Sequence, residues 1–291
     1  MKIYFANVYG ETVKHDIQLT VPYALVESGE ESLALSQGFY KTYWDYPGDH
    51  FFEDFADTDQ NVWLQARLGR ITSQEYKPGR TTRAAKRKYL GNELTYRISK
   101  PADLSETDKF KLHATFFSYI KFKGYSPQAD VQTIFGYQEY FKNFMISHVE
   151  NRRIIMFYYK SDLIAFSCFE IFGDSIFGCQ FAWNYRQPKL SLGKMQISFI
   201  HDYALKNDIK YIYLGLCYGK QCVYKAGFKS FEYWTGKDWL NDKDRYIKMC
   251  ESDSAVESLN DLEDLLDSNF TTLWGTDQPY QLFKRKNEHQ R

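Results

Sequence analysis

The stretch that decides the fold is residues 185–239, YRQPKLSLGKMQISFIHDYALKNDIKYIYLGLCYGKQCVYKAGFKSFEYWTGKDW. A Ser-Leu-Gly turn at residues 191–193 precedes apolar residues at helical spacing, which predicts a helix over 192–206. An apolar strand over 211–217 follows, then a short link with a Tyr-Lys pair, then a strand over 228–234. We expect this layout to gather backbone N–H groups, hydroxyls and one lysine around a single cleft.

Length and composition favour a globular protein of one large or two modest domains. The chain has 291 residues, of which 44% are apolar and 18% aromatic, so it can bury a sizeable core. The aromatic residues are consistent with a buried core and hydrated aromatic side chains at the surface. They are also consistent with stacking platforms for bases and flat ligands. Basic and acidic residues both number 37, so any nucleic-acid signal must be local.

Cysteine use and the N-terminus indicate a reduced, cytoplasmic protein with no membrane partner. No cysteine pair has C-x-x-C spacing, and no His/Cys cluster has the spacing of a zinc site. The N-terminal residues lack the apolar core of a signal peptide, and no apolar run approaches a membrane span. The five cysteines are Cys168, Cys179, Cys217, Cys222 and Cys250.

The chain upstream of the deciding stretch changes character near residue 80. Residues 1–79 are turn-rich and aromatic, with short strand-like runs near 3–8 and 63–71, and we interpret them as a small irregular α+β subdomain. Regular patterns begin at Glu93. Ser105 is predicted to cap a helix, with Asp108 as its capping-box partner. The further elements predicted here are strands over 93–99, 153–159, 163–171 and 175–183, and a second helix over 131–148.

The predicted order is strand, two helices, three strands, helix, strand, short helix, strand. This order is similar to that of the GNAT acyltransferase fold, in which an amino acceptor and an acyl donor meet where two central strands part. We therefore expect an α+β protein with a GNAT-like domain over 80–291. Other α+β folds share parts of this order.

Two features of the deciding stretch are suited to acyl transfer. The Ser-Leu-Gly turn opens a helix, and a helix N-terminus offers unpaired N–H donors to a phosphate or an oxyanion. The other interpretation is an ordinary serine N-cap. Lys225 and Tyr224 in the link could contact an ester or phosphate, and Tyr213 could bind the acyl donor. Alternatively, the lysine is solvated and the tyrosines belong to the core.

The segment KPGRTTRAAKRK, residues 77–88, has six basic residues and no acidic one. On a helix, the Arg80/Arg83/Arg87 spacing places three guanidinium groups on one face, which favours phosphate contacts. A solvated basic helix is the other interpretation. The six candidates for contacts with tRNA are Lys77, Arg80, Arg83, Lys86, Arg87 and Lys88.

Several motifs together resemble the arginyl- and leucyl-tRNA–protein transferases. The strongest are Ser191-Leu192-Gly193, Tyr213-Leu214-Gly215 and Tyr224-Lys225, with Phe228 and Glu232 beyond them. Ala34–Phe39, the basic segment 77–88 and Asp162–Ala165 resemble other parts of the family pattern. Two departures stand out. The family's cysteine cluster before the basic segment is missing, and Asn184 stands where the family has a carboxylate.

The resemblance implies aminoacyl transfer from aminoacyl-tRNA to a primary amine, most often a protein or peptide N-terminus, as a degradation signal (an N-degron). The ester is already activated, so we expect no cofactor and no metal, with aminoacyl-tRNA as co-substrate. The catalytic candidates are Leu192, Gly193, Tyr224 and Lys225. The substrate-binding candidates are Trp183, Asn184, Ser191 and Tyr213, with Glu170 and Glu232 as candidate proton acceptors.

Two alternatives stay open on the sequence. One is a GNAT N-acetyltransferase that uses acetyl-CoA, although PKLSLGK contains only one glycine of the usual pyrophosphate loop. The other is a catalytically inactive module that binds tRNA or degrons, which the substitution at residue 184 and the missing cysteines would allow.

Overall fold

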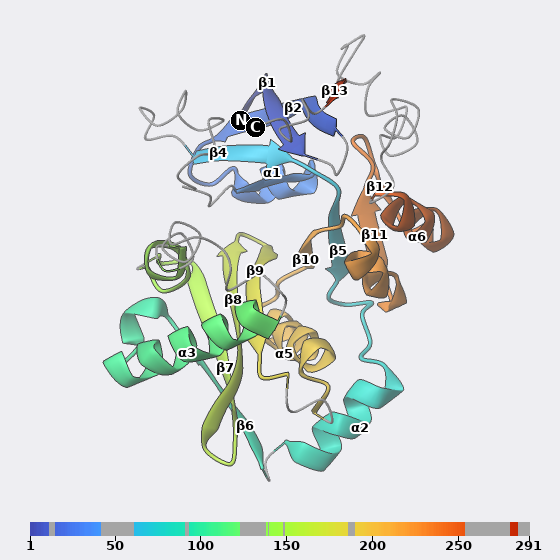
Figure 1. Ribbon diagram of the computed structural model, residues 1–291. Coiled ribbons are helices and arrows are strands. Elements are labelled where there is room, and N and C mark those ends of the chain that lie inside the picture. The colour runs from blue at the N-terminus through green and yellow to red at the C-terminus, as the bar shows by residue number, and fades with distance from the viewer. Residues whose placement is uncertain are drawn as a thin grey trace, which may run out of the picture. The chain divides into compact units, whose positions relative to one another are not determined.

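The computed structural model describes residues 1–11, 15–41, 61–90, 93–122, 138, 140–147, 149–185, 190–253 and 280–284. The chain forms two compact units (Figure 1). The terminal unit comprises residues 1–42, 48–71 and 214–291, and the central unit comprises 43–47 and 72–213. The two units are described separately.

The central unit is built on a sheet in the order β10-β9-β8-β7-β6. Its strands are β6 (Leu94–Ser99), β7 (Arg152–Tyr159), β8 (Asp162–Phe172), β9 (Ser175–Trp183) and β10 (Tyr211–Leu216). β6 to β9 pair antiparallel, and β10 pairs parallel with β9. β7 and β8 consist largely of buried apolar residues, as expected for strands covered on both faces.

Helices α3 (Glu106–Phe122) and α5 (Leu192–Lys206) cover opposite faces of this sheet (Figure 1). Phe116 of α3 packs in a core cluster with Ile154 and Met156. Phe157, on the other face of the same strand, contacts Phe199 of α5 with ring centroids 5.3 Å apart. Helix α2 (Arg80–Tyr89), η2 (Pro101–Asp103) and the π-helical turn η3 (Tyr140–Met145) complete the unit.

The start of α3 confirms the predicted capping box. The backbone N–H of Asp108 donates to Ser105 Oγ at 3.1 Å, and the carboxylate of Asp108 accepts from the hydroxyl of Ser105 at 2.8 Å. The second predicted helix, over 131–148, lies mostly outside the described residues. Its described part contains the π-helical turn η3.

The terminal unit contains a sheet that pairs β1 (Lys2–Glu11), β2 (His15–Val26), β4 (Asn61–Gln65) and β3 (Phe39–Lys41) in that order. β13 (Tyr280–Lys284) also pairs with β2. The N-terminal part of the chain therefore has more regular sheet than its turn-rich sequence predicted. Helix α1 (Glu31–Ser36) precedes β3.

The rest of the terminal unit comes from segments far apart in the sequence. β11 (Phe231–Trp234) pairs antiparallel with β5 (Leu68–Thr72) and with β12 (Trp239–Leu240). The 3-10 segment η5 (Lys220–Gly227) and helix α6 (Lys243–Ser252) follow β10 and β12. A Cβ at Gly38 would lie 2.2 Å from the ring of Trp234, so this close approach requires glycine.

The chain passes from the terminal to the central unit after Ile71 and returns within β10, between Tyr213 and Leu214. Residues 214–291 thus fold with residues 1–42 and 48–71. The predicted domain boundary between residues 79 and 80 stays a prediction.

Candidate active site

β9 and β10 pair over a short distance. Their parallel register runs from Tyr211–Ser175 to Tyr213–Phe177, whereas β9 continues to Trp183. The pairing of β8 with β9 shifts register next to Cys168, which leaves Cys179 as an extra residue in β9. A bulge increases the local twist and bends the strand. The pairing of β9 with β10 therefore covers three register positions, and β9 continues beyond it.

The Ser-Leu-Gly turn begins α5 in the same unit. Ser191 occupies the N-cap position with φ of 50°, and its side chain makes no capping hydrogen bond. Its carbonyl accepts from the N–H groups of Lys194 and Met195. The N–H groups of Leu192 and Gly193 stand before the first possible helical hydrogen bond, so helix geometry gives them no acceptor within α5. Leu192 is buried and Gly193 is exposed.

The predicted binding residues at the end of β9 are half-buried. Trp183 stacks on Phe181 with ring centroids 5.0 Å apart and contacts Tyr119 at 4.4 Å. The N–H of Asn184 donates to Ile164 O at 2.6 Å, which extends the pairing of β8 with β9 by one residue. Tyr213 is fully buried, as the core interpretation of this tyrosine requires.

Glu170 has a well-defined partner in the interior of the central unit. Its Oε1 accepts from Arg152 Nε at 3.0 Å and from Nη2 at 2.5 Å, and both side chains are almost completely buried. Burial lowers the pKa of Arg152, but Cys168 and Glu170 raise it, and the net pKa lies above its ordinary value. The structure therefore shows Glu170 in a buried ion pair.

Lys225 lies in the terminal unit and is buried rather than solvated, with 5% of its surface exposed. Its ammonium group donates to Leu214 O at 2.9 Å and to Leu216 O at 2.5 Å. Burial lowers the pKa of Lys225, but Cys217, Cys222 and Tyr224 raise it, and the net pKa is raised. Lys225 is thus a charged group tethered to the backbone of β10. Its neighbour Tyr224 is 57% exposed.

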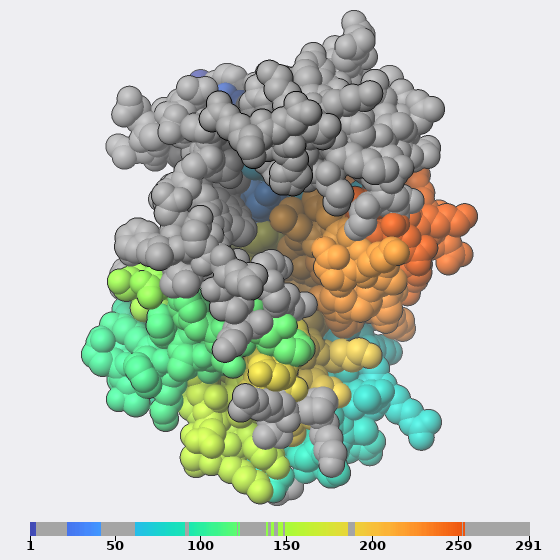
Figure 2. All heavy atoms as spheres, viewed as in Figure 1, coloured from blue at the N-terminus to red at the C-terminus, as the bar shows by residue number. Residues whose placement is uncertain are grey.

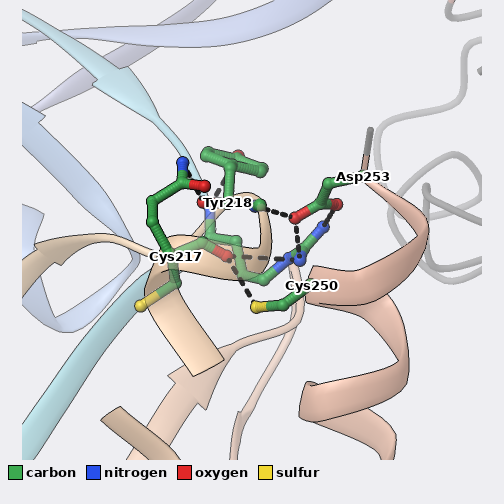
Figure 3. Close-up of polar contacts among 7 residues, drawn as sticks. Cys217, Tyr218, Cys250 and Asp253 are labelled. Atoms are coloured by element: carbon green, nitrogen blue, oxygen red, sulfur yellow. Dashed lines mark hydrogen bonds and ion pairs between the residues drawn. The ribbon is translucent and has the colours of Figure 1, made fainter. Parts of the chain in front are cut away.

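A buried ion pair holds the segment that leads from β10 to Lys225. Arg67 binds Asp253 with two hydrogen bonds, of 2.9 Å and 3.1 Å, and also donates to Cys217 O at 3.2 Å. Asp253 also accepts from the N–H of Gly219, and the Arg67 N–H donates to the Tyr218 hydroxyl at 2.9 Å (Figure 3). We call these five residues the Arg67 clamp.

Helix α6 reinforces the same segment. Cys250 donates from its thiol to Cys217 O at 3.6 Å (Figure 3), and the Tyr246 hydroxyl donates to Cys222 O at 2.9 Å. Glu232 of β11 pairs with Arg70 Nε at 2.8 Å, and the Arg70 guanidinium lies over the Trp239 ring. The side chain of Glu232 keeps 30% of its surface exposed.

The basic segment forms α2, as predicted. Thr82 and Ala85 are buried, and Arg80, Arg83 and Arg87 are exposed together with Lys77 and Lys88. The cyan atoms of α2 lie at the surface in Figure 2. Lys86 differs from the other five, because it pairs with Asp202 of α5 at 2.5 Å and lies over the Phe199 ring.

The sequence analysis missed Arg67 and Arg152, two of the buried arginines, and with them Asp253. Each arginine lies at or before a strand and resembles a solvated end residue. The one signal of a buried ion pair was a pairing across strands, because Arg152 of β7 and Glu170 of β8 are register partners. That signal requires the pairing to be known first.

Within the described part of the chain, no group of three or more His, Cys, Asp and Glu residues could hold a metal ion. No helix among the same residues is long and apolar enough to span a membrane.

Comparisons with known proteins cover part of the chain, from α3 in the central unit to β11 in the terminal unit. Residues 108–235 match the family model described as arginine-tRNA-protein transferase, C terminus. No curated protein sequence matches.

Solved structures with partial likeness include the following three. A C-terminal domain assigned to a lysylphosphatidylglycerol synthetase of Agrobacterium fabrum shares 9% identity at a TM-score of 0.39, over 52% of this chain and 46% of that one. L-PGS from Bacillus licheniformis shares 10% sequence identity at a TM-score of 0.38, over 52% of this chain and 46% of that one. A conserved protein of unknown function from Bacteroides thetaiotaomicron shares 8% sequence identity at a TM-score of 0.38, over 52% of this chain and 51% of that one.

This chain spans about half the length of each of these proteins. Residues 108–235 are a match to the C-terminal part of the arginine-tRNA–protein transferase family, which confirms the resemblance predicted from the sequence.

Proposed function

We propose that this protein transfers an aminoacyl group from aminoacyl-tRNA to a primary amine at the N-terminus of a protein or peptide. The observation that carries the proposal is the juxtaposition, in one unit, of a short β9–β10 pairing and the exposed start of α5 within the segment that matches the transferase family. The modified N-terminus would act as a degradation signal. Charged tRNA as co-substrate places the reaction in the cytoplasm.

The reaction needs positioning and charge stabilisation, since the ester is already activated. The amine nitrogen attacks the ester carbonyl carbon, and a C–N bond forms while the carbonyl oxygen becomes an oxyanion. Collapse of this intermediate breaks the bond to the ribose oxygen. The amine loses one proton and the ribose oxygen gains one, so that an amide and a free tRNA hydroxyl result.

We assign the oxyanion to the N–H groups of Leu192 and Gly193. They point out of the positive end of a helix, and no helical acceptor competes for them. Ser191 fixes the turn that presents them. Lys225 and Tyr224, which belong to the terminal unit, keep the roles expected from the sequence, a positive charge for the ester or the terminal phosphate and a ring for the adenosine.

Asn184 and Trp183, both half-buried, would line the pocket for the aminoacyl and amine groups, and the fully buried Tyr213 would belong to the core. Of the two candidate proton acceptors, Glu232 keeps 30% of its side chain exposed whereas Glu170 has none. We therefore assign proton acceptance to Glu232, and a structural role to Glu170.

The exposed face of α2 would bind the tRNA backbone. Arg80, Arg83 and Arg87 are exposed and can contact phosphates, together with Lys77 and Lys88. Lys86 would instead hold α2 to α5, because its ammonium already binds Asp202.

The test is transfer from tRNA charged with a pool of radiolabelled amino acids to peptides that differ only in their first residue. We expect label in the peptide, stable to ribonuclease and to mild base, and absent when the peptide N-terminus is acetylated. A parallel reaction with labelled acetyl-CoA tests the GNAT alternative. Label only from acetyl-CoA, or tRNA binding without transfer, would replace the proposal by one of the two alternatives.

A further inference from the structure

A lysine and two cysteines come together where η5 folds back on the end of β10. Lys225 Nζ lies 3.7 Å from Cys217 Sγ. The Cys222 thiol donates to Leu216 O at 3.5 Å, and the same carbonyl accepts from Lys225 Nζ at 2.5 Å. All four residues belong to the terminal unit. The lysine ammonium therefore contacts one thiol and shares an acceptor with the other.

Burial keeps Lys225 and Cys217 in contact. Cys217 is completely buried, and Lys225 is almost completely so. A Cβ at Gly69 would lie 2.6 Å from Cys217 Sγ, so the thiol is packed against the backbone of β5. On the other side, Leu214 O and Leu216 O hold the ammonium group. Neither side chain has room to turn away, so the nitrogen and the sulfur stay neighbours.

Lys225 also provides the charge that a reactive thiol needs. A cation beside a sulfur stabilises the thiolate, which is the form that reacts with oxidants. The Lys225 ammonium has this position beside Cys217. For the thiols of Cys222 and Cys250, burial outweighs the nearby positive charges and raises the pKa above its ordinary value.

We propose that Cys217 and Lys225 form a covalent N–O–S bridge when the protein is oxidised by hydrogen peroxide. One peroxide converts the Cys217 thiol to a sulfenic acid and leaves as water. A second peroxide takes two electrons from the sulfenic O–H and the lysine N–H, so that an N–O bond forms and two waters leave. The ammonium group releases one further proton. The protein thereby gains one oxygen and loses two hydrogens.

The bridge would make this contact a reversible switch of the proposed activity. Its formation follows from the geometry alone, whereas its effect rests on the proposed function, in which Lys225 gives a positive charge to the ester or phosphate. The bridged nitrogen is bonded to oxygen and no longer carries that charge. Two equivalents of dithiothreitol supply the four electrons that restore thiol and amine and release the bridging oxygen as water.

Tryptic mapping of the full chain detects the bridge without any assay of transfer. After peroxide treatment and digestion without reductant, we expect residues 211–220 joined to residues 221–229, with one oxygen gained and two hydrogens lost. The second peptide runs to residue 229 because trypsin does not cut after a bridged Lys225. Dithiothreitol should separate the two peptides and restore the cut after Lys225.

Two buried thiols of the terminal unit provide the matched comparison. Cys217→Ser removes the sulfur beside Lys225, and Cys250→Ser removes an equally buried sulfur that donates to Cys217 O. We expect the joined peptides in Cys250→Ser and not in Cys217→Ser. Cys222→Ser, which removes the competing thiol, should form the bridge as the wild type does.

Transfer from charged tRNA provides the second measurement. We expect the bridged wild type to lose about a hundredfold in rate, as for removal of one stabilising charge, and to recover with dithiothreitol. The rate of Cys217→Ser should be the same before and after peroxide treatment.

The peptide map separates the bridge from the other products of oxidation. A disulfide between Cys217 and Cys222 would join residues 211–220 to residues 221–225, since trypsin would still cut after Lys225, and it would overturn the proposal. Oxidation of Cys217 to a sulfinic or sulfonic acid alone, or no reaction with peroxide, would overturn it as well. A bridge in a chain that shows no transfer before or after reduction would leave the bridge standing and refute the proposed function.

Discussion

A substitution at Gly193 can test the proposed oxyanion site without lowering the stability of the fold. It is the exposed second residue of α5. An aspartate there would face the positive end of the helix, which favours folding by about 0.3–1 kcal/mol. The same negative charge would repel an oxyanion or phosphate. We therefore predict that Gly193→Asp keeps or raises the melting temperature and lowers the transfer rate at least tenfold.

Gly193→Asn is the control for this prediction, since it adds a side chain of the same size without the charge. The measurement is single-turnover transfer beside thermal unfolding. If both variants lose the same activity, the site needs empty space at residue 193, and charge is not the reason.

Lys225 requires a variant that keeps its bulk, because the side chain is buried. Lys225→Met retains an unbranched stem but leaves Leu214 O and Leu216 O without their donor, so we expect a lower melting temperature. We also predict a loss of about a hundredfold in transfer rate, the usual effect of removing one stabilising group. Rates must be compared well below the melting temperature, with the folded fraction checked by circular dichroism. A folded variant with the wild-type rate would make Lys225 a structural lysine.

The pKa of Asp108 lets us predict how the stability of the central unit changes at low pH. Burial raises the pKa of Asp108, but hydrogen bonds from Arg97 and Ser105 outweigh this effect, so the pKa lies below its ordinary value. A carboxyl with a depressed folded-state pKa contributes stability above its ordinary pKa and loses it as pH falls through the folded pKa. We predict that the melting temperature of Asp108→Asn is lower than wild type at pH 7 and that the gap closes below about pH 4. A gap that is constant from pH 7 to pH 3 would show that the charge of Asp108 is irrelevant.

At the scale of elements, α2 is a helix with one face for packing and one for solvent. Its buried residues Thr82 and Ala85 lie on the packing side, and Lys86 pairs with Asp202 of α5. We predict that the combined reversal Arg80→Glu, Arg83→Glu and Arg87→Glu weakens binding of charged tRNA and flattens its salt dependence, because about three phosphate contacts are lost.

Three exposed lysines on helices other than α2 provide a control with the same change in net charge. They are Lys111, Lys206 and Lys248. A filter-binding titration at several salt concentrations should separate the two triple variants. Equal losses in both would mean that α2 is no special contact surface.

Elements with a strong local pattern could be predicted from the sequence, and elements fixed by distant partners could not. The helix over 192–206 and the strand over 175–183 have the predicted bounds, since each has its own hydrophobic period. The last strand begins at Phe231 rather than 228, because η5 continues through Gly227. The run near 63–71 is broken at Ala66 and Arg67 into β4 and β5, which pair with different partners.

The candidate site could likewise be predicted only where it depends on a local sequence pattern. The Ser-Leu-Gly turn was visible as a helix start, and Lys225 as a lysine in the link after the strand 211–217. That Lys225 is buried and bound to two carbonyls depends on η5 folding back on β10, and no spacing in the sequence encodes that contact. Helix α6 was not predicted, although its N-cap Asp242 accepts from the Arg245 N–H at 3.0 Å.

At the scale of the whole molecule, the Arg67 clamp joins parts of the chain that are far apart in sequence. Arg67 precedes β5, and Asp253 follows α6. Loss of one partner of a buried ion pair costs about 3–5 kcal/mol. We predict that Asp253→Asn lowers the melting temperature by about 10 °C, whereas Asp244→Asn, at an exposed position in the first turn of α6, has almost no effect.

Differential scanning calorimetry is the measurement for the clamp, because separate transitions would reveal separate units. An unchanged profile for Asp253→Asn would mean that the ion pair adds no net stability, as replacement of some buried pairs has shown.

The division of the chain into two units has a consequence for biosynthesis. The ribosome releases residues 1–71 first, yet their unit is completed only by residues 214–291, and β2 receives its partner β13 last of all. At about 5–20 residues per second, the central unit takes on the order of ten seconds to synthesise. During that interval the residues of β2 that later pair with β13 have no partner strand on that side. An unpaired strand edge can pair with other chains, so this part of β2 is open to aggregation until residues 280–284 have been translated.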